Sequence, residues 1–285
     1  MGEQRLVPVG GGAQVCVETI GAPDAPAILL IGGAASSMDR WDDEFCRLLA
    51  DHGRLVVRYD HRDTGASTSY PPGAPGYTGA DLVADAVAVL DGLGIERAHV
   101  VGISMGAALA QELGLEHRDR VATLTLMSTT AIFAGDEDLP GMTPELREAF
   151  ANPPPDPDWR DRAAVIDHMV ATERPYSGPG DFDEDRLRAL AARVFDRTSD
   201  MAASMKNHWL IDDGAPVQGS MADLAGIPTL VLHGSADPMF PPAHGRALAD
   251  QIPGARFVEL EGVGHELAPP RLWPVLVDEI VRHTA

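Results

Sequence analysis

The chain has 285 residues, of which 45% are hydrophobic, and this is enough for one large α/β domain with an insertion. Its net charge is −21 and Lys206 is its only lysine, so a nucleic acid or an anionic membrane, which would need a basic patch, is disfavoured as a partner. No apolar run approaches the ~20 residues of a membrane span, and residues 1–6 contain no long apolar signal segment. We therefore expect a cytoplasmic protein that binds neither nucleic acid nor membrane.

The cysteines and histidines give no sign of a metal centre. Cys16 and Cys46 fall in an expected strand and an expected helix, where they offer neither a disulfide framework nor metal-ligand spacing. The ten histidines never occur as His-x₃-His or His-Glu-x-x-His. We expect no metal and no cofactor.

The first 130 residues alternate strand and helix signals in the manner of a doubly wound sheet. An edge hairpin is expected around three consecutive glycines, and amphipathic helices separate the strands that follow. The expected strands are 6–9, 15–20, 27–31, 55–59, 98–101 and 124–127, with helices around 41–49 and 82–93. The continuous apolar run at 27–31 is typical of a strand covered on both faces.

No comparable strand follows until residues 229–233. The stretch of about 95 residues between holds Pro/Asp-rich joints and several helical patterns, which predict a helical cap over 131–226 inserted into a core formed by 1–130 and 227–285. Some of its side chains either line an apolar pocket or form the core of the cap itself: Trp159, Met169, Met201, Met205, His208 and Trp209. The alternation then resumes, with a helix near 247–252, a strand at 256–260 and a final helix near 276–281.

The pentapeptide at 102–106 reads Gly-Ile-Ser-Met-Gly, between an apolar strand and a run of small helix-forming residues. A sharp turn from strand to helix strains its central residue and needs small residues two positions before and after it. It exposes the Ser104 hydroxyl above the carboxyl end of the sheet, with the Met105 amide and the helix N-terminus directed at an oxyanion. An ordinary turn with a helix-capping serine would also explain these five residues. Whether Ser104 is a nucleophile therefore depends on whether the chain supplies its catalytic partners.

A serine nucleophile needs a histidine base and a carboxylate that orients it. Asp237 follows the expected strand 229–233, and His265 follows the expected strand 256–260, so both fall at the carboxyl edge of the sheet. The order Ser104, Asp237, His265 is the one expected for a strand-turn-helix nucleophile. An Asp-Pro turn or an incidental loop histidine would explain either residue alone, and His61 is the competing base, although it follows the wrong strand for this order.

These motifs resemble the α/β-hydrolase superfamily across nearly the whole chain. The loop at 59–67, YDHRDTGAS, looks like the D-x-R-x-x-G-x-S loop of that family. Its Arg-Asp-Thr-Gly form, the pair Gly32-Gly33 in place of His-Gly, and the segment 84–105 are similar to anthracycline methyl esterases of the aclacinomycin type. The resemblance implies an α/β-hydrolase fold, and an oxyanion hole formed by the backbone N–H of Met105 and of Ala34, with Gly33 as the alternative.

Serine at the elbow disfavours the haloalkane dehalogenases and epoxide hydrolases of this superfamily, which carry aspartate there. We expect a serine carboxylesterase whose partner is a hydrophobic small-molecule ester, such as the methyl ester of an aromatic polyketide. The alternatives are a C–C bond hydrolase or cofactor-free perhydrolase with the same triad, and a ligand-binding module without catalysis. The cap, which shapes the substrate pocket, looks least like that of the methyl esterases, so the resemblance does not fix the substrate.

Overall fold

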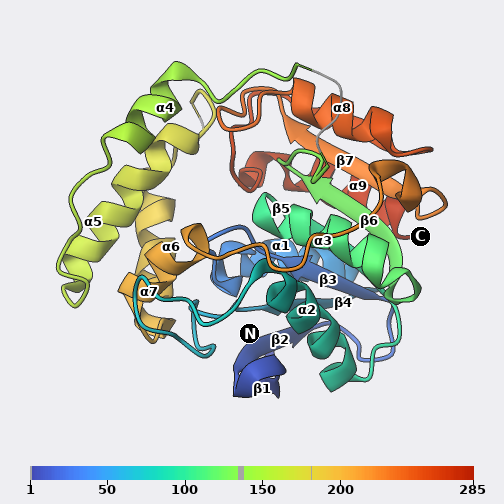
Figure 1. Cartoon of the computed structure of the whole chain (residues 1–285), viewed down its shortest axis with the longest axis horizontal. Coiled ribbons are helices and arrows are strands. Elements are labelled where there is room, and N and C mark those ends of the chain that lie inside the picture. Colours follow the sequence, from blue (N-terminus) through green and yellow to red (C-terminus); the bar gives the residue numbers. More distant parts are fainter. Residues whose placement is uncertain (1, 134–137, 181) are drawn as a thin grey trace.

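The computed structural model describes residues 2–133, 138–180 and 182–285. Among these residues, one sheet of eight strands forms the centre, in the order β1-β2-β4-β3-β5-β6-β7-β8 (Figure 1). The strands are β1 (Glu3–Pro8), β2 (Gln14–Ile20), β3 (Ala27–Ile31), β4 (Leu55–Tyr59), β5 (Ala98–Ile103), β6 (Val121–Met127), β7 (Thr229–Gly234) and β8 (Arg256–Leu260). The β1–β2 hairpin and the β2–β4 pair are antiparallel, and the other neighbours are parallel, so the expected mostly parallel fold class is confirmed.

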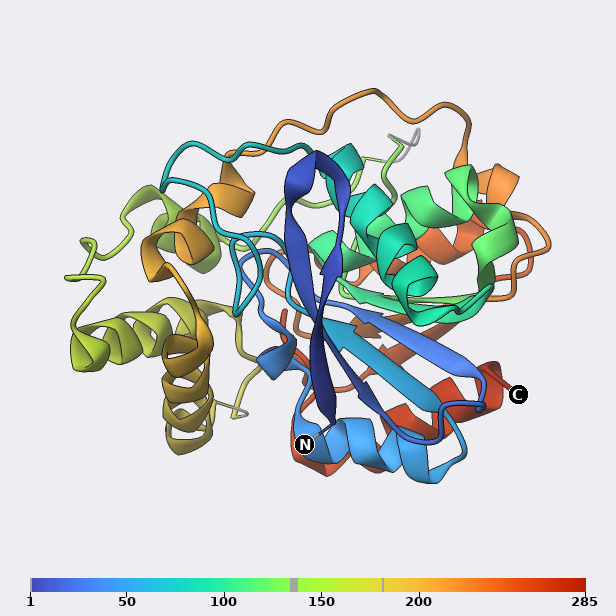
Figure 2. The ribbon, with the colours of Figure 1, turned by 90° about the horizontal axis from the view of Figure 1, so that it is seen from below.

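Helices cover both faces of the sheet, as Figure 2 shows. One face packs against α1 (Asp43–Asp51) and α9 (Trp273–His283), and the other against α2 (Gly79–Leu93), α3 (Met105–Glu116) and α8 (Ala243–Gln251). In β3, Leu29 and Ile31 pack on the second face and Ile28 and Leu30 on the first, all fully buried. The apolar run is therefore continuous because both sides of the strand are covered.

In the described part of the chain between β6 and β7 there are four α-helices, and they stand beside the sheet in both views (Figures 1 and 2). They are α4 (Pro144–Ala151), α5 (Arg162–Glu173), α6 (Glu184–Arg197) and α7 (Met201–Lys206). Met221 and Leu224, near the end of the expected cap, are instead buried in the cluster that contains α2 and α3. The boundaries of the cap stay a prediction, and 134–137 and 181 within it lie outside the described residues.

Short 3-10 turns complete the described elements: η1 (Gly10–Gly12), η2 (Met38–Arg40), η3 (Arg118–Arg120), η4 (Arg174–Tyr176), η5 (Asn207–Trp209), η6 (Met221–Leu224) and η7 (Pro270–Leu272). None of the helices in the described ranges is long and apolar enough to cross a membrane. Trp41, expected inside a helix, lies before α1, because the Asp42 side chain caps that helix by accepting from Glu44 N. Its ring still stacks on Phe45 at 6.2 Å.

Candidate active site

Ser104 stands at a tight turn between β5 and α3, with φ 53° and ψ −121°. A Cβ added to Gly102 would lie 2.2 Å from Gly106 O, and one added to Gly106 would lie 2.3 Å from Ile31 O. Both glycines are therefore required by close backbone contacts. A serine in the left-handed region is strained, and such strain is typical of functional positions. The turn is the one expected from the pentapeptide.

The structure brings Ser104, His265 and Asp237 together. His265 Nε2 lies 3.0 Å from Ser104 Oγ, and His265 Nδ1 lies 2.9 Å from Asp237 Oδ2 and 3.1 Å from Oδ1. When Nδ1 carries the proton and donates a hydrogen bond to the carboxylate, Nε2 is left to accept a hydrogen bond from the serine hydroxyl. The geometry suits a nucleophile, its base and an orienting acid, whereas their catalytic roles stay predictions.

The Asp237 carboxylate is buried and accepts hydrogen bonds from the backbone. Its side chain is fully buried, and Oδ1 also accepts the backbone N–H groups of Met239 and Phe240, both at 2.9 Å. Nearby, His233 Nε2 donates to Phe240 O at 2.7 Å, and burial lowers the His233 pKa, so this ring stays neutral beside the carboxylate. The donors around Asp237 thus keep it fixed while it faces His265.

The loop after β3 lies against Ser104. It forms a turn in which Ser36 N donates to Gly33 O at 3.3 Å, with Ala35 at φ 55°. A Cβ added to Gly33 would lie 3.5 Å from Ser104 Cβ. The Ala35 N–H is engaged, because it donates to His208 Nδ1 at 2.8 Å. Gly33 and Ala34 therefore both stay candidates for the second oxyanion donor, beside Met105 at the start of α3.

His61, the competing base, has a different place. Its ring is fully buried, and burial lowers its pKa to about 3. Its Nε2 lies 3.0 Å from Gly32 O, and since a carbonyl only accepts, Nε2 must carry the proton. His61 therefore supports the loop after β3 instead of serving Ser104.

A cavity of about 640 Å³ opens at Ser104 and His265 and extends among the inserted helices. Of the six residues expected either to line a pocket or to fill the cap, Trp159, Met205 and Trp209 line this cavity. Met169 and Met201 pack in the cluster of the inserted helices. The cavity wall also carries charge: Arg40 pairs with Glu173, Lys206 pairs with Asp156, and Glu266 accepts the Gly178 N–H at 2.8 Å. Among the described residues, no group of three or more metal-binding side chains converges.

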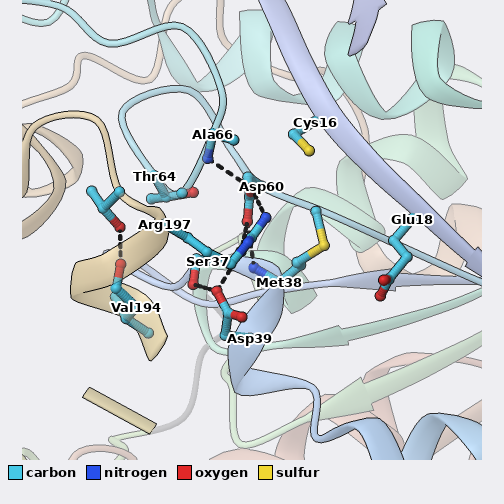
Figure 3. Close-up of polar contacts among 12 residues, drawn as sticks. Cys16, Glu18, Ser37, Met38, Asp39, Asp60, Thr64, Ala66, Val194 and Arg197 are labelled. Atoms are coloured by element: carbon cyan, nitrogen blue, oxygen red, sulfur yellow. Dashed lines mark hydrogen bonds and ion pairs between the residues drawn. The ribbon is translucent and has the colours of Figure 1, made fainter. Parts of the chain in front are cut away.

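The loop that follows β4 carries polar contacts that sequence reasoning missed. Asp60 is fully buried and accepts Met38 N at 2.8 Å and Ala66 N at 3.0 Å, and Arg197 Nη2, from the end of α6, donates to it at 2.8 Å (Figure 3). Arg197 also pairs with Asp39. These contacts join α6 to the segment that follows β3 and carries the candidate oxyanion donors.

Comparisons with known proteins show which family the chain is similar to. Residues 26–269 match the family model described as alpha/beta hydrolase fold. Rhodomycin D methylesterase DauP from Streptomyces sp. strain C5 is 37% identical, covering 94% of this chain and 93% of its own, and rhodomycin D methylesterase DnrP from Streptomyces peucetius is 35% identical with the same coverage. The crystal structure of an enol-lactonase from Burkholderia xenovorans LB400 superimposes with a TM-score of 0.72 at 26% identity, over 98% of this chain and 99% of that one.

The chain belongs to the α/β-hydrolase family. Its likeness to the two methylesterases over nearly its whole length makes it a carboxylic-ester hydrolase, and it confirms the resemblance to anthracycline methyl esterases.

Proposed function

We propose that this hydrolase removes the alcohol from a bulky hydrophobic ester, in the first place a methyl ester, through an acyl-enzyme on Ser104. Ser104 Oγ attacks the ester carbonyl carbon while its proton passes to His265 Nε2. The N–H groups of Met105 and Ala34 or Gly33 stabilise the oxyanion. The intermediate collapses with cleavage of the bond to the alkoxy oxygen, which takes the proton from His265, and water then releases the acid by the same route.

The cavity that ends at Ser104 carries the substrate proposal. Its volume of about 640 Å³ is that of a site for a drug-sized ligand, far more than a short acyl chain needs. Phe150 of α4, Trp159 of the turn before α5 and Trp209 of η5 line it. Such a wall favours a large flat acyl group, and the methylesterase relatives favour a small alcohol.

A substrate panel tests this proposal. The methyl ester of a polycyclic aromatic acid is compared with p-nitrophenyl acetate, with a vinylogous diketone and with acetate plus peroxide, for the wild type and Ser104→Ala. We expect the highest kcat/KM on the polycyclic methyl ester, with free acid and methanol as products, and no turnover by the variant. Preferred C–C cleavage or peracid formation would overturn the proposal, as would tight binding without turnover.

The composition bears on where the enzyme acts and on its partners. With a net charge of −21, the enzyme is proposed to act on a free small molecule in the cytoplasm, without nucleic acid or a membrane as partner. Labelled protein that stays in the cytoplasmic fraction of its host after lysis in high salt is the expected result.

A further inference from the structure

The turn beside Ser104 is held by a side chain from far along the chain. His208, in η5, is 5% exposed; its Nδ1 accepts the Ala35 N–H at 2.8 Å, and its Nε2 lies 2.9 Å from Arg62 O. Because the Arg62 carbonyl only accepts, Nε2 carries the proton and Nδ1 keeps its lone pair for Ala35. Burial lowers the His208 pKa to about 4, so the ring is neutral near pH 7 and fulfils both roles.

Ala35 needs such a partner. It occupies the third position of the turn from Gly33 to Ser36 with φ 55°, where glycine or asparagine is preferred. A left-handed alanine stores strain that the surrounding contacts must overcome. Once the acceptor is gone, the turn is free to relax, and the peptide groups of Gly33 and Ala34 would move with it.

Two other side chains of the inserted segment, Arg197 and Asn207, make hydrogen bonds to the core elsewhere than at this turn. Arg197 donates to Asp60, whose carboxylate accepts the Met38 N–H, beyond the Gly33–Ser36 turn (Figure 3). Asn207, next to His208 and fully buried, accepts from Gly73 N at 2.7 Å and donates to Asp63 Oδ2 at 2.9 Å. Of these three side chains, only His208 contacts the candidate oxyanion loop.

We propose that His208 is a positioning residue, which sets the oxyanion donors of the Gly33–Ala34 turn against Ser104 through the N–H of Ala35. This inference rests on the proposed function. It makes the inserted segment part of transition-state stabilisation as well as the wall of the cavity. Its effect falls on kcat, because oxyanion donors act when charge develops on the substrate oxygen and contribute little to substrate binding.

The two ring nitrogens can be tested separately. In His208→Asn, the amide oxygen takes the place of Nδ1 and still accepts from Ala35, whereas in His208→Gln the amide nitrogen takes the place of Nε2 and serves only Arg62 O. We expect kcat to fall about 10- to 100-fold in His208→Ala and His208→Gln, with KM changed by less than about threefold, and His208→Asn to regain most of that loss. The rate at which a fluorophosphonate modifies Ser104 should follow the same order, because its phosphoryl oxygen occupies the oxyanion hole.

Asn207→Ala is the matched control. It removes buried hydrogen bonds of the same η5 turn, so it should lower Tm while leaving kcat and the labelling rate of folded protein unchanged. Equal kcat in the Asn and Gln variants, or a loss of kcat that follows Tm through Asn207→Ala as well, overturns the role of His208. Failure of the wild type to react with the fluorophosphonate would instead refute the proposed function. Should the alanine variant not fold, the Asn and Gln pair carries the test.

Discussion

The backbone N–H of His265 donates to the carbonyl oxygen of Tyr176 at 2.7 Å, so the proposed base is held by the inserted segment as well as by its own loop. The two backbones lie in close contact there. A Cβ added to Gly178 would lie 1.9 Å from Gly262 O, and one added to Gly264 would lie 2.1 Å from Tyr176 O. The segment after α5 therefore contacts the backbone of the loop that carries His265.

Gly178→Ala should separate these two backbones. Because the added methyl group would lie 1.9 Å from the Gly262 carbonyl oxygen, one of the two backbones must move, and we expect the His265 loop to shift and kcat to fall at least about tenfold. Gly141→Ala, in the same inserted segment, meets only the end of the Arg147 side chain, at 3.5 Å, and serves as the control. Steady-state kinetics on the preferred ester measure both, and equal kcat in the two variants would contradict this role.

Ala34→Pro tests which amide is the second oxyanion donor. Ala34 is the second residue of its turn, a position that proline favours, so the variant is expected to fold while it lacks the N–H. If Ala34 donates, kcat should fall about 10²- to 10³-fold. Ala35→Gly keeps every N–H and relieves the strain at φ 55°, so it should stay active. An Ala34→Pro enzyme with wild-type kcat would assign the donor to Gly33.

Arg197→Gln should destabilise the fold, because it leaves the buried Asp60 without its cation. Loss of one partner of a buried pair costs about 3 kcal/mol, and we expect a loss of that order in urea unfolding at pH 7.5. Arg162→Gln removes a surface pair with Asp196 and should leave the unfolding midpoint unchanged. Similar midpoints for both variants would contradict the importance of the Asp60 contact.

The same variant has a distinct pH dependence. Burial already raises the pKa of Asp60, and without Arg197 this pKa should rise further. A carboxyl group whose pKa is higher in the folded than in the unfolded chain takes up its proton first in the folded state. The deficit of Arg197→Gln relative to the wild type should therefore shrink as the pH falls from 7.5 to 5. A constant deficit would show that Asp60 is not the cause.

Burial of His208 predicts that the wild type loses stability as the pH falls. His208 has its pKa lowered by burial to about 4, whereas in the unfolded chain it protonates near pH 6.5. The unfolded state thus binds the proton first, and the contribution is complete above pH 6.5 and lost as the pH falls toward 4. The His208→Asn variant lacks this titrating group, so its free energy of unfolding should fall by about 3 kcal/mol less than that of the wild type. Urea unfolding from pH 7 to 4.5 measures the difference, and parallel curves would contradict the assignment.

Much of the fold could be predicted from the sequence, because its signals are local. Apolar runs predicted the strands of the doubly wound sheet, and the spacing of Gly102, Ser104 and Gly106 predicted the sharp turn between β5 and α3. Asp237 and His265 could be found because each follows a strand whose carboxyl end must meet the same edge.

The contacts of the inserted segment could not be predicted in this way. His208 pairs with Ala35, 173 residues away, and Arg197 with Asp60, 137 residues away. These pairs depend on how the inserted helices pack on the core, which no periodicity of the sequence specifies. The sequence pattern places His208 with Met169 among residues that line a pocket or fill the cap, whereas in the structure the histidine accepts the Ala35 N–H.

Covalent labelling decides whether Ser104 is the nucleophile. The wild type and Ser104→Ala are treated with a fluorophosphonate at neutral pH, and intact-mass analysis is followed by peptide mapping. We expect one adduct per chain, located on Ser104, with a parallel loss of esterase activity, and no adduct on the variant. An unmodified Ser104 in a preparation that hydrolyses esters, or an adduct on another residue that accompanies the loss of activity, would contradict it.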